Sequence, residues 1–224
     1  MNIQTDFASE EYIKVTRGAI DCDGHILEPP DLWETYLEPK YRDRAIKIVT
    51  NDEGYECLQY DGQLSKLSPP GFVGILGAMG NPDHSPSPTR KYVAGAPFGS
   101  MDPKQRLQLM DREGVAKSIL YPTLGILWEA EVKDPELSAA YSRAYNRWIV
   151  DFCADSGGRL VPIAHISLGD PDMAADELKR AVEAGCKGGF IVPFTWSGIA
   201  PGEQHYDKLW ATAQDLGVPM AIHP

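Results

Sequence analysis

The feature that most constrains this chain is a regular alternation of apolar strands and amphipathic helices from about residue 102 onward. Three of the predicted helices begin at an Asp-Pro pair, and each helix is followed by glycine, which is typical of helix starts and stops. Continuous apolar strands separated by helices indicate a parallel sheet covered by helices. The predicted strands, including one before the alternation begins, are 18–23, 115–121, 160–167, 187–192 and 218–223.

Two α/β architectures satisfy this alternation. An open doubly wound sheet of five strands would be complete at 224 residues. A (β/α)₈ TIM barrel would need roughly three further β/α units. Because Pro224 follows the last predicted strand without the helix that either fold places next, we favour the barrel. We therefore expect a single, C-terminally incomplete TIM-barrel domain over residues 1–224 that covers about strands 1–5.

An insertion at residues 46–101 interrupts the pattern after the first predicted strand. Its first part, 46–64, alternates about the turn Asp52-Glu53-Gly54, which predicts a β-hairpin. The remainder, 65–101, is rich in Pro, Gly and Ser and is interpreted as too irregular for helices or strands, although 72–79 are apolar. Long loops of this kind are often functional lids. We predict an inserted flap or lid that gains order when a ligand or partner binds.

Composition excludes several classes of partner. With 21 Lys+Arg against 32 Asp+Glu, the net charge is −11, so neither nucleic acid nor an anionic membrane surface is expected as a partner. The four cysteines lie far apart and form no metal or redox motif, which predicts reduced thiols. The N-terminus has two glutamates where a signal peptide has basic residues. We expect a cytoplasmic homo-oligomer that acts on a small molecule.

Residues with metal-binding chemistry lie at the ends of the predicted strands. Asp23 and His25 are two positions apart in a predicted strand, so both side chains can point to the same side. His223 ends the last strand, and His165 lies in the third. A carboxylate with imidazoles is a ligand set for Zn²⁺, Mn²⁺ or Fe²⁺. Asp23 alone could equally cap a turn, but a histidine that ends an apolar strand favours the metal site.

Several segments then carry a family pattern: 20–26 (IDCDGHI), 28–33 (EPPDLW), 41–44 (YRDR), 157–160, 183–188 and 217–224. Together they resemble the amidohydrolase-related TIM-barrel enzymes, in the branch that contains aminocarboxymuconate semialdehyde decarboxylase and the resorcylate decarboxylases. The resemblance covers nearly the whole chain apart from the N-terminal lead-in and the insertion.

The resemblance implies a mononuclear divalent metal at the mouth of the barrel, Zn²⁺ first with Mn²⁺ as the alternative. The family's strand-one ligands commonly read His-x-His or Glu-x-His; the matching positions here are Asp23 and His25, a departure that keeps the geometry and adds negative charge. The family's strand-five histidine matches His223. Its strand-eight aspartate, and the strand-six catalytic histidine of its decarboxylases, have no counterpart in these residues, so the catalytic residue is expected beyond residue 224.

Other residues have both a functional and a structural interpretation. We predict that Trp128, His165 and Phe194 line the substrate pocket, because all three lie in or just after predicted strands. The structural alternative is core packing for Trp128 and Phe194, and a hydrogen-bonded core histidine for His165. The acidic cluster Glu129, Glu131, Asp134 and Glu136 is interpreted as a solvated helix start.

The resulting hypothesis is a metal-dependent enzyme of the amidohydrolase superfamily. Its favoured reaction is non-oxidative decarboxylation, or a related C–C cleavage, of a small carboxylated or aromatic substrate, with metal-activated hydrolysis of an amide, ester or lactone as the alternative. A catalytically silent metal-binding or scaffold protein is a third possibility. A flavodoxin-like binding module is disfavoured, because the acidic residues after the first strand replace the amides that a phosphate-binding loop needs.

Overall fold

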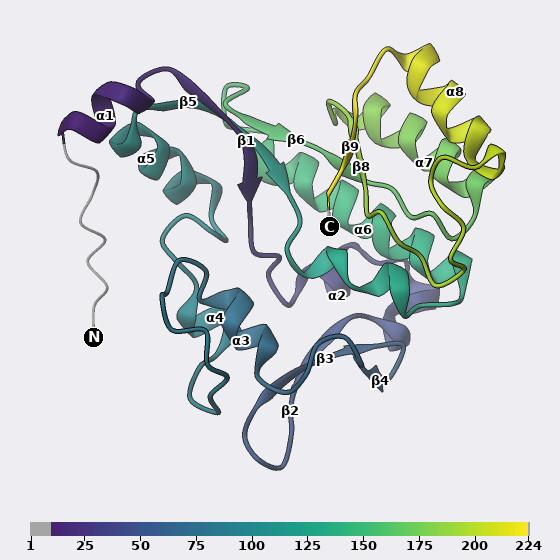
Figure 1. Cartoon of the computed structure of the whole chain (residues 1–224), viewed down its shortest axis with the longest axis horizontal. Helices are drawn as coiled ribbons and strands as arrows, with labels where there is room; N and C mark the ends of the chain where they lie inside the picture. Colours follow the sequence, from purple (N-terminus) through teal and green to yellow (C-terminus); the bar gives the residue numbers. More distant parts are fainter. Residues whose placement is uncertain (1–9, 224) are drawn as a thin grey trace.

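The computed structural model describes residues 10–223; the lead-in before Glu10 and the final Pro224 lie outside the described residues. Two three-stranded parallel sheets with the orders β1-β5-β6 and β7-β8-β9 form the centre of the fold (Figure 1). Their bounds are β1 Ala19–His25, β5 Val115–Tyr121, β6 Leu160–Pro162, β7 Ala164–His165, β8 Gly189–Ile191 and β9 Met220–Ile222. The predicted positions of all five strand regions are close to these bounds.

The prediction of one continuous strand over 160–167 is wrong, because the chain changes its pairing at Ile163. β6 pairs with β5, whereas β7 pairs with β8. The two sheets remain connected at this point: the Lys187 amide donates to the Pro162 carbonyl at 2.9 Å, and the Ala164 amide donates to Gly188 at 3.0 Å. Each strand region thus neighbours the next one along the chain. A doubly wound sheet reverses its strand order at a switch point, and the described strands show no such reversal.

The Asp-Pro and glycine signals predict most ends of the helices between the strands, but the helix that begins at Pro135 ends at Cys153, before the predicted stop at Gly157-Gly158. Asp102 and Asp170 each accept an amide hydrogen bond of 2.8 Å from the residue three positions on. Asp134 accepts amide hydrogen bonds from Glu136 at 3.1 Å and Leu137 at 3.3 Å. Gly114 and Gly217 end their helices in the left-handed conformation, at φ 75° and 64°. These helices are α5 Pro103–Glu113, α6 Pro135–Cys153, α7 Pro171–Ala184 and α8 Asp207–Leu216, the last preceded by the 3₁₀ turn η4 Gln204–Tyr206.

The insertion contains more regular structure than its composition suggests. The predicted hairpin is present as β2 Lys47–Thr50 and β3 Glu56–Tyr60, extended by β4 Gln63–Leu64. The prediction that 65–101 lacks helices is wrong, because the segment holds α3 Phe72–Gly77 and α4 Tyr92–Gly95. Close packing explains α3: a Cβ on Gly77 would lie 2.4 Å from the Tyr92 carbonyl oxygen, so only glycine permits this contact.

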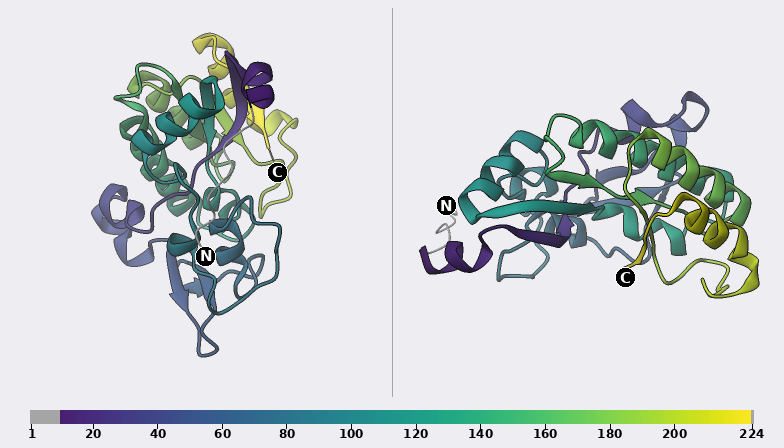
Figure 2. Two further views of the ribbon diagram at one scale, coloured as in Figure 1. Left: turned by 90° about the vertical axis from the view of Figure 1, so that its left-hand side faces the viewer. Right: turned by 90° about the horizontal axis from the view of Figure 1, so that it is seen from above.

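The insertion lies to one side of the parallel strands, yet it shares their core (Figures 1 and 2). Leu58, Val73 and Tyr92 of the insertion are fully buried in the same apolar cluster as Leu27 and Trp33. The remaining short helices are α1 Glu10–Thr16, α2 Leu32–Tyr36, η1 Pro39–Arg44, η2 Leu124–Ile126 and η3 Trp128–Ala130. None of the helices in the described part of the chain is long and apolar enough to cross a membrane.

Candidate metal centre

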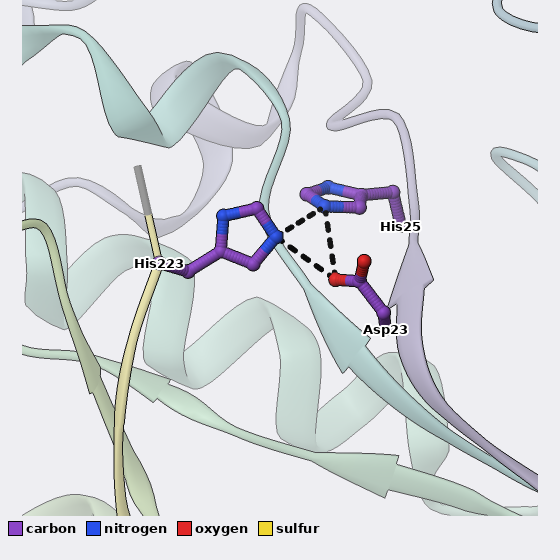
Figure 3. Close-up of side chains that lie close together, drawn as sticks. All are labelled: Asp23, His25 and His223. Atoms are coloured by element: carbon purple, nitrogen blue, oxygen red, sulfur yellow. Dashed lines mark hydrogen bonds and ion pairs between the residues drawn. The ribbon is translucent and has the colours of Figure 1, made fainter.

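Three predicted ligands meet at the carboxyl ends of β1 and β9, although His223 lies 200 positions after Asp23 and 198 after His25 in the sequence. The side chains of Asp23, His25 and His223 point toward one another (Figure 3). His223 Nε2 lies 2.9 Å from Asp23 Oδ1 and 3.3 Å from His25 Nε2, and His25 Nε2 lies 3.6 Å from Asp23 Oδ1. Within residues 10–223 this is the one group of three or more such side chains with metal-binding spacing.

The curvature of the parallel strands brings these ends together. β1 and β9 belong to different sheets, so the three side chains meet between two sheets rather than along one. Gly24, between the two β1 ligands, allows β1 to approach β5 closely: a Cβ there would lie 2.1 Å from Ser118 Oγ and 2.9 Å from the Ile119 carbonyl oxygen. The register of β1 against β5 is irregular between Asp21 and Gly24, the stretch that carries Asp23.

The imidazole of His25 is held in a defined tautomer. Its Nδ1 lies 2.9 Å from the Pro122 carbonyl oxygen. A carbonyl only accepts, so Nδ1 carries the proton and Nε2 keeps its lone pair facing Asp23 and His223. Burial, and then the charge of His223, lower the pKa of His25 below its usual value. Both effects favour the neutral imidazole that a metal ligand must be.

The donor set fits a single divalent cation. In a tetrahedral site with ligand distances of about 2.1 Å, neighbouring donor atoms lie about 3.4 Å apart. The three observed separations, 2.9, 3.3 and 3.6 Å, bracket that spacing. Two imidazole nitrogens that face each other with a carboxylate beside them are typical of side chains that share one cation.

A family comparison agrees with this geometry. The model of the amidohydrolase family matches residues 20–224. The chain belongs to the amidohydrolase family. Among curated relatives of the chain are gamma-resorcylate decarboxylases from a Rhizobium species and from Rhodococcus jostii, both 30% identical, over 125 and 128 residues. Each match covers 53% of this chain and 38% of the relative, so the chain spans well under half of these curated relatives.

Solved structures show the same fold. An amidohydrolase from Mycobacterium avium subsp. paratuberculosis superposes with a TM-score of 0.72 at 22% identity, over 93% of this chain and 59% of that chain. A 5-carboxyvanillate decarboxylase from Novosphingobium aromaticivorans, complexed with manganese and a nitrobenzoic acid, gives a TM-score of 0.60 at 20% identity, over 93% and 50%. These amidohydrolase-family neighbours indicate a TIM-barrel fold, as the sequential strand order does.

The three residues predicted to bind substrate lie in different surroundings. Trp128 is fully buried, and its ring packs against Trp33 and His165 with centroid distances of 5.7 and 4.3 Å. His165 is fully buried beside Phe190, whose ring in turn contacts that of His223. Phe194 is 36% exposed. The structure does not bring these three side chains together at Asp23 and His25, and their part in substrate binding stays a prediction.

The interpretation of the acidic cluster is wrong for Glu129, which is 1% exposed. Its carboxylate accepts hydrogen bonds from Trp128 Nε1 at 3.0 Å, Ser138 Oγ at 3.3 Å and the Leu168 amide at 3.2 Å, and lies 3.7 Å from His165 Nε2. Burial raises the pKa of Glu129 to about 7. The only sequence signal for this burial is the apolar run around Trp128.

This raised pKa predicts a pH-dependent effect of Glu129→Gln. Folded Glu129 stays protonated up to about pH 7, whereas the unfolded side chain ionises near pH 4.3. Folding stability due to Glu129 is therefore full below the unfolded pKa and is lost as the pH rises toward 7. Glutamine resembles the protonated acid, so the variant should gain about 3 kcal/mol relative to the parent between pH 4.5 and 7.5. Urea unfolding of both proteins at pH 4.5 and pH 7.5 measures their free energies of unfolding. If the difference in free energy between variant and parent is the same at both pH values, the prediction is wrong.

Proposed function

We propose that this amidohydrolase is a mononuclear metal-dependent enzyme that decarboxylates a small aromatic carboxylate. The observation that carries the proposal is the convergence of Asp23, His25 and His223 on one point. The gamma-resorcylate decarboxylases among its relatives support the substrate class. We propose Zn²⁺ as the metal, because two imidazoles and a carboxylate suit it, with Mn²⁺, which a structural neighbour binds, as the alternative.

The residues of the chain prepare this site for an anionic substrate and a cation. The Pro122 carbonyl orients the His25 imidazole, while burial, and then the charge of His223, lower the pKa of His25 and favour the neutral ring. The side chain of Asp23 is 70% exposed, so the site opens to solvent on the side of this carboxylate, and the two histidines, 22% and 27% exposed, line its inner side. A bound divalent metal would supply a positive charge that anchors the carboxylate and a neighbouring hydroxyl of an aromatic acid.

Hydrolysis is the second candidate, because the family model that matches the chain is that of the amidohydrolases. The same metal would then lower the pKa of a water molecule for attack on an amide, ester or lactone. The two candidates share the three ligand residues and differ in the bond that is broken.

A single assay separates the candidates. Purified protein, stripped of metal and reloaded with Zn²⁺ or Mn²⁺, is incubated with dihydroxybenzoates and, separately, with aryl esters and lactones. We expect metal-dependent loss of the carboxylate as CO₂, and no turnover by His223→Ala. Ester or lactone cleavage alone would favour the hydrolase. Metal binding without turnover of any substrate would favour the scaffold interpretation.

We also propose that the insertion, residues 46–101, is a lid or subunit contact of this enzyme and that the enzyme is a homo-oligomer. The exposed apolar side chains Leu64, Leu67, Val93 and Phe98 support a surface that is covered by a ligand or a second copy. Amide hydrogen exchange over 65–101 should slow when an aromatic acid binds or when subunits associate. Equally slow exchange with and without ligand in a monomer, established by sedimentation, would contradict this.

We propose a cytoplasmic location for the same enzyme. The four free thiols in the described residues support it. Fractionation of the native host should place the protein with the cytoplasmic markers; recovery from an extracellular or periplasmic fraction would contradict the assignment.

A further inference from the structure

A buried carboxylate lies directly behind the candidate metal centre. Glu28 is fully buried, and its two oxygens accept four hydrogen bonds from three consecutive backbone amides of the loop after β5. The Thr123 amide lies 3.2 and 3.1 Å from the two oxygens, the Leu124 amide 2.9 Å from Oε2, and the Gly125 amide 2.9 Å from Oε1. These amides begin the 3₁₀ turn η2, and the first amides of a helical turn have no acceptor within it. Glu28, from the segment after β1, accepts their hydrogen bonds instead.

The same loop holds His25. The Pro122 carbonyl, one residue before the amides bound by Glu28, accepts the Nδ1 proton of His25 at 2.9 Å. Thr123 Oγ1 donates to the Ile26 carbonyl at 2.8 Å and lies 3.4 Å from His25 Nδ1. The Ile26 amide donates to the Tyr121 carbonyl at 3.2 Å. The segments after β1 and after β5 are therefore joined on both sides of the Pro122 carbonyl.

We propose that Glu28 is a positioning residue for the metal ligand His25. By fixing the amides of residues 123–125, its carboxylate holds the Pro122 carbonyl where it orients the imidazole, with Nε2 toward Asp23 and His223. The inference rests on the proposed function in one respect, namely that His25 binds a metal. The orientation of the imidazole itself follows from contacts within the chain.

A carboxylate is required here because the loop presents only donors. A glutamine amide would retain the shape of Glu28 but would place an NH₂ group against at least one backbone N–H in either orientation. The loop has little room to adjust: a Cβ on Gly125 would lie 2.9 Å from Pro122 Cβ and 3.3 Å from Glu28 Oε1. Loss of the carboxylate should therefore move the loop, and with it the Pro122 carbonyl.

The test compares Glu28→Gln with Glu129→Gln in the full chain. Both replace a fully buried glutamate that accepts backbone amides, but Glu129 contacts neither His25 nor the 122–125 loop amides. The Zn²⁺ dissociation constant is measured by competition with a chelating dye, and unfolding is followed in parallel. We expect Zn²⁺ binding to weaken about 10- to 100-fold in Glu28→Gln, as for residues that orient metal ligands, and about 2-fold or less in Glu129→Gln.

A second readout does not depend on metal. Long-range ¹H–¹⁵N spectra of the metal-free protein report the tautomer of His25, which we expect to be Nδ1–H in the parent and mixed in Glu28→Gln. If the parent shows this tautomer but binds no Zn²⁺, the proposed function fails and the positioning role stands. A parent that binds Zn²⁺, with Glu28→Gln equal to it in both affinity and tautomer, would overturn the positioning role alone, as would equal weakening by both variants.

Glu28→Asp keeps the test decisive if Glu28→Gln does not fold. Aspartate retains the carboxylate but is one methylene shorter, so its oxygens are withdrawn from the amides of residues 123–125. We expect Zn²⁺ binding to weaken about 10-fold, with a mixed tautomer of His25. A folded Glu28→Asp protein with unchanged affinity and an unchanged His25 spectrum would overturn the proposal.

Discussion

His25→Ala is expected to weaken binding of Zn²⁺ by on the order of 100-fold or more, because it removes one of only three side-chain donors in the described part of the site. The remaining donors, Asp23 and His223, lie 2.9 Å apart and can still bind a metal weakly. Competition titration of the purified protein measures the change. Elemental analysis of the parent should find about one transition metal per chain.

The matched control is His84→Ala, which removes an exposed histidine of the insertion that belongs to no metal-binding group. Its metal content and affinity should equal those of the parent. If His25→Ala retains the parent's metal content and affinity, His25 is not a ligand, and the proposed centre is wrong.

Trp128→Ala is expected to cost about 3 to 5 kcal/mol of folding stability, as large-to-small changes at fully buried tryptophans do. The indole packs edge to face on both Trp33 and Tyr141, and its Nε1 donates to the buried carboxylate of Glu129. The change therefore opens a cavity and also removes a hydrogen bond from a buried acid. Urea unfolding at pH 7 gives the difference in free energy.

Trp196→Ala is the control of the same residue type. Trp196 is 40% exposed, and its backbone amide, which alanine retains, donates to the Glu129 carbonyl at 2.9 Å. We expect a loss of about 0.5 kcal/mol or less. If the two variants lose similar stability, the core role that the structure gives Trp128 is wrong; if Trp128→Ala is stable but binds aromatic acids weakly, its predicted place in the substrate pocket is favoured instead.

Local chemistry explains which parts of the fold the sequence predicts well. Helix boundaries such as Asp102 and Gly114 depend on a side-chain cap or a left-handed backbone, and both are encoded within a few residues. The break at Ile163 depends instead on which neighbour each half of the strand pairs with, which a single strand's pattern does not encode. Helix α3 depends on close packing of Gly77 against Tyr92, so its composition alone indicates a loop.

The same distinction between local and long-range interactions applies to the residues of the candidate site. The Asp-x-His spacing and the histidine at the end of an apolar strand predict Asp23, His25 and His223, because strand periodicity and parallel topology bring them to one place. The buried acids Glu28 and Glu129 were not predicted. Their burial depends on amide and side-chain donors supplied by distant segments, such as the Leu168 amide for Glu129. The one signal for Glu28 is its position directly after the apolar pair Ile26-Leu27.

Anomalous diffraction from crystals of the metal-loaded protein tests the central claim most directly. Data collected on both sides of the metal's absorption edge locate the ion without reference to activity. We predict one peak per chain, about 2.0 to 2.2 Å from His25 Nε2, His223 Nε2 and a carboxylate oxygen of Asp23. A peak bound by other residues, or a fully loaded protein with no peak among these three side chains, would contradict the account.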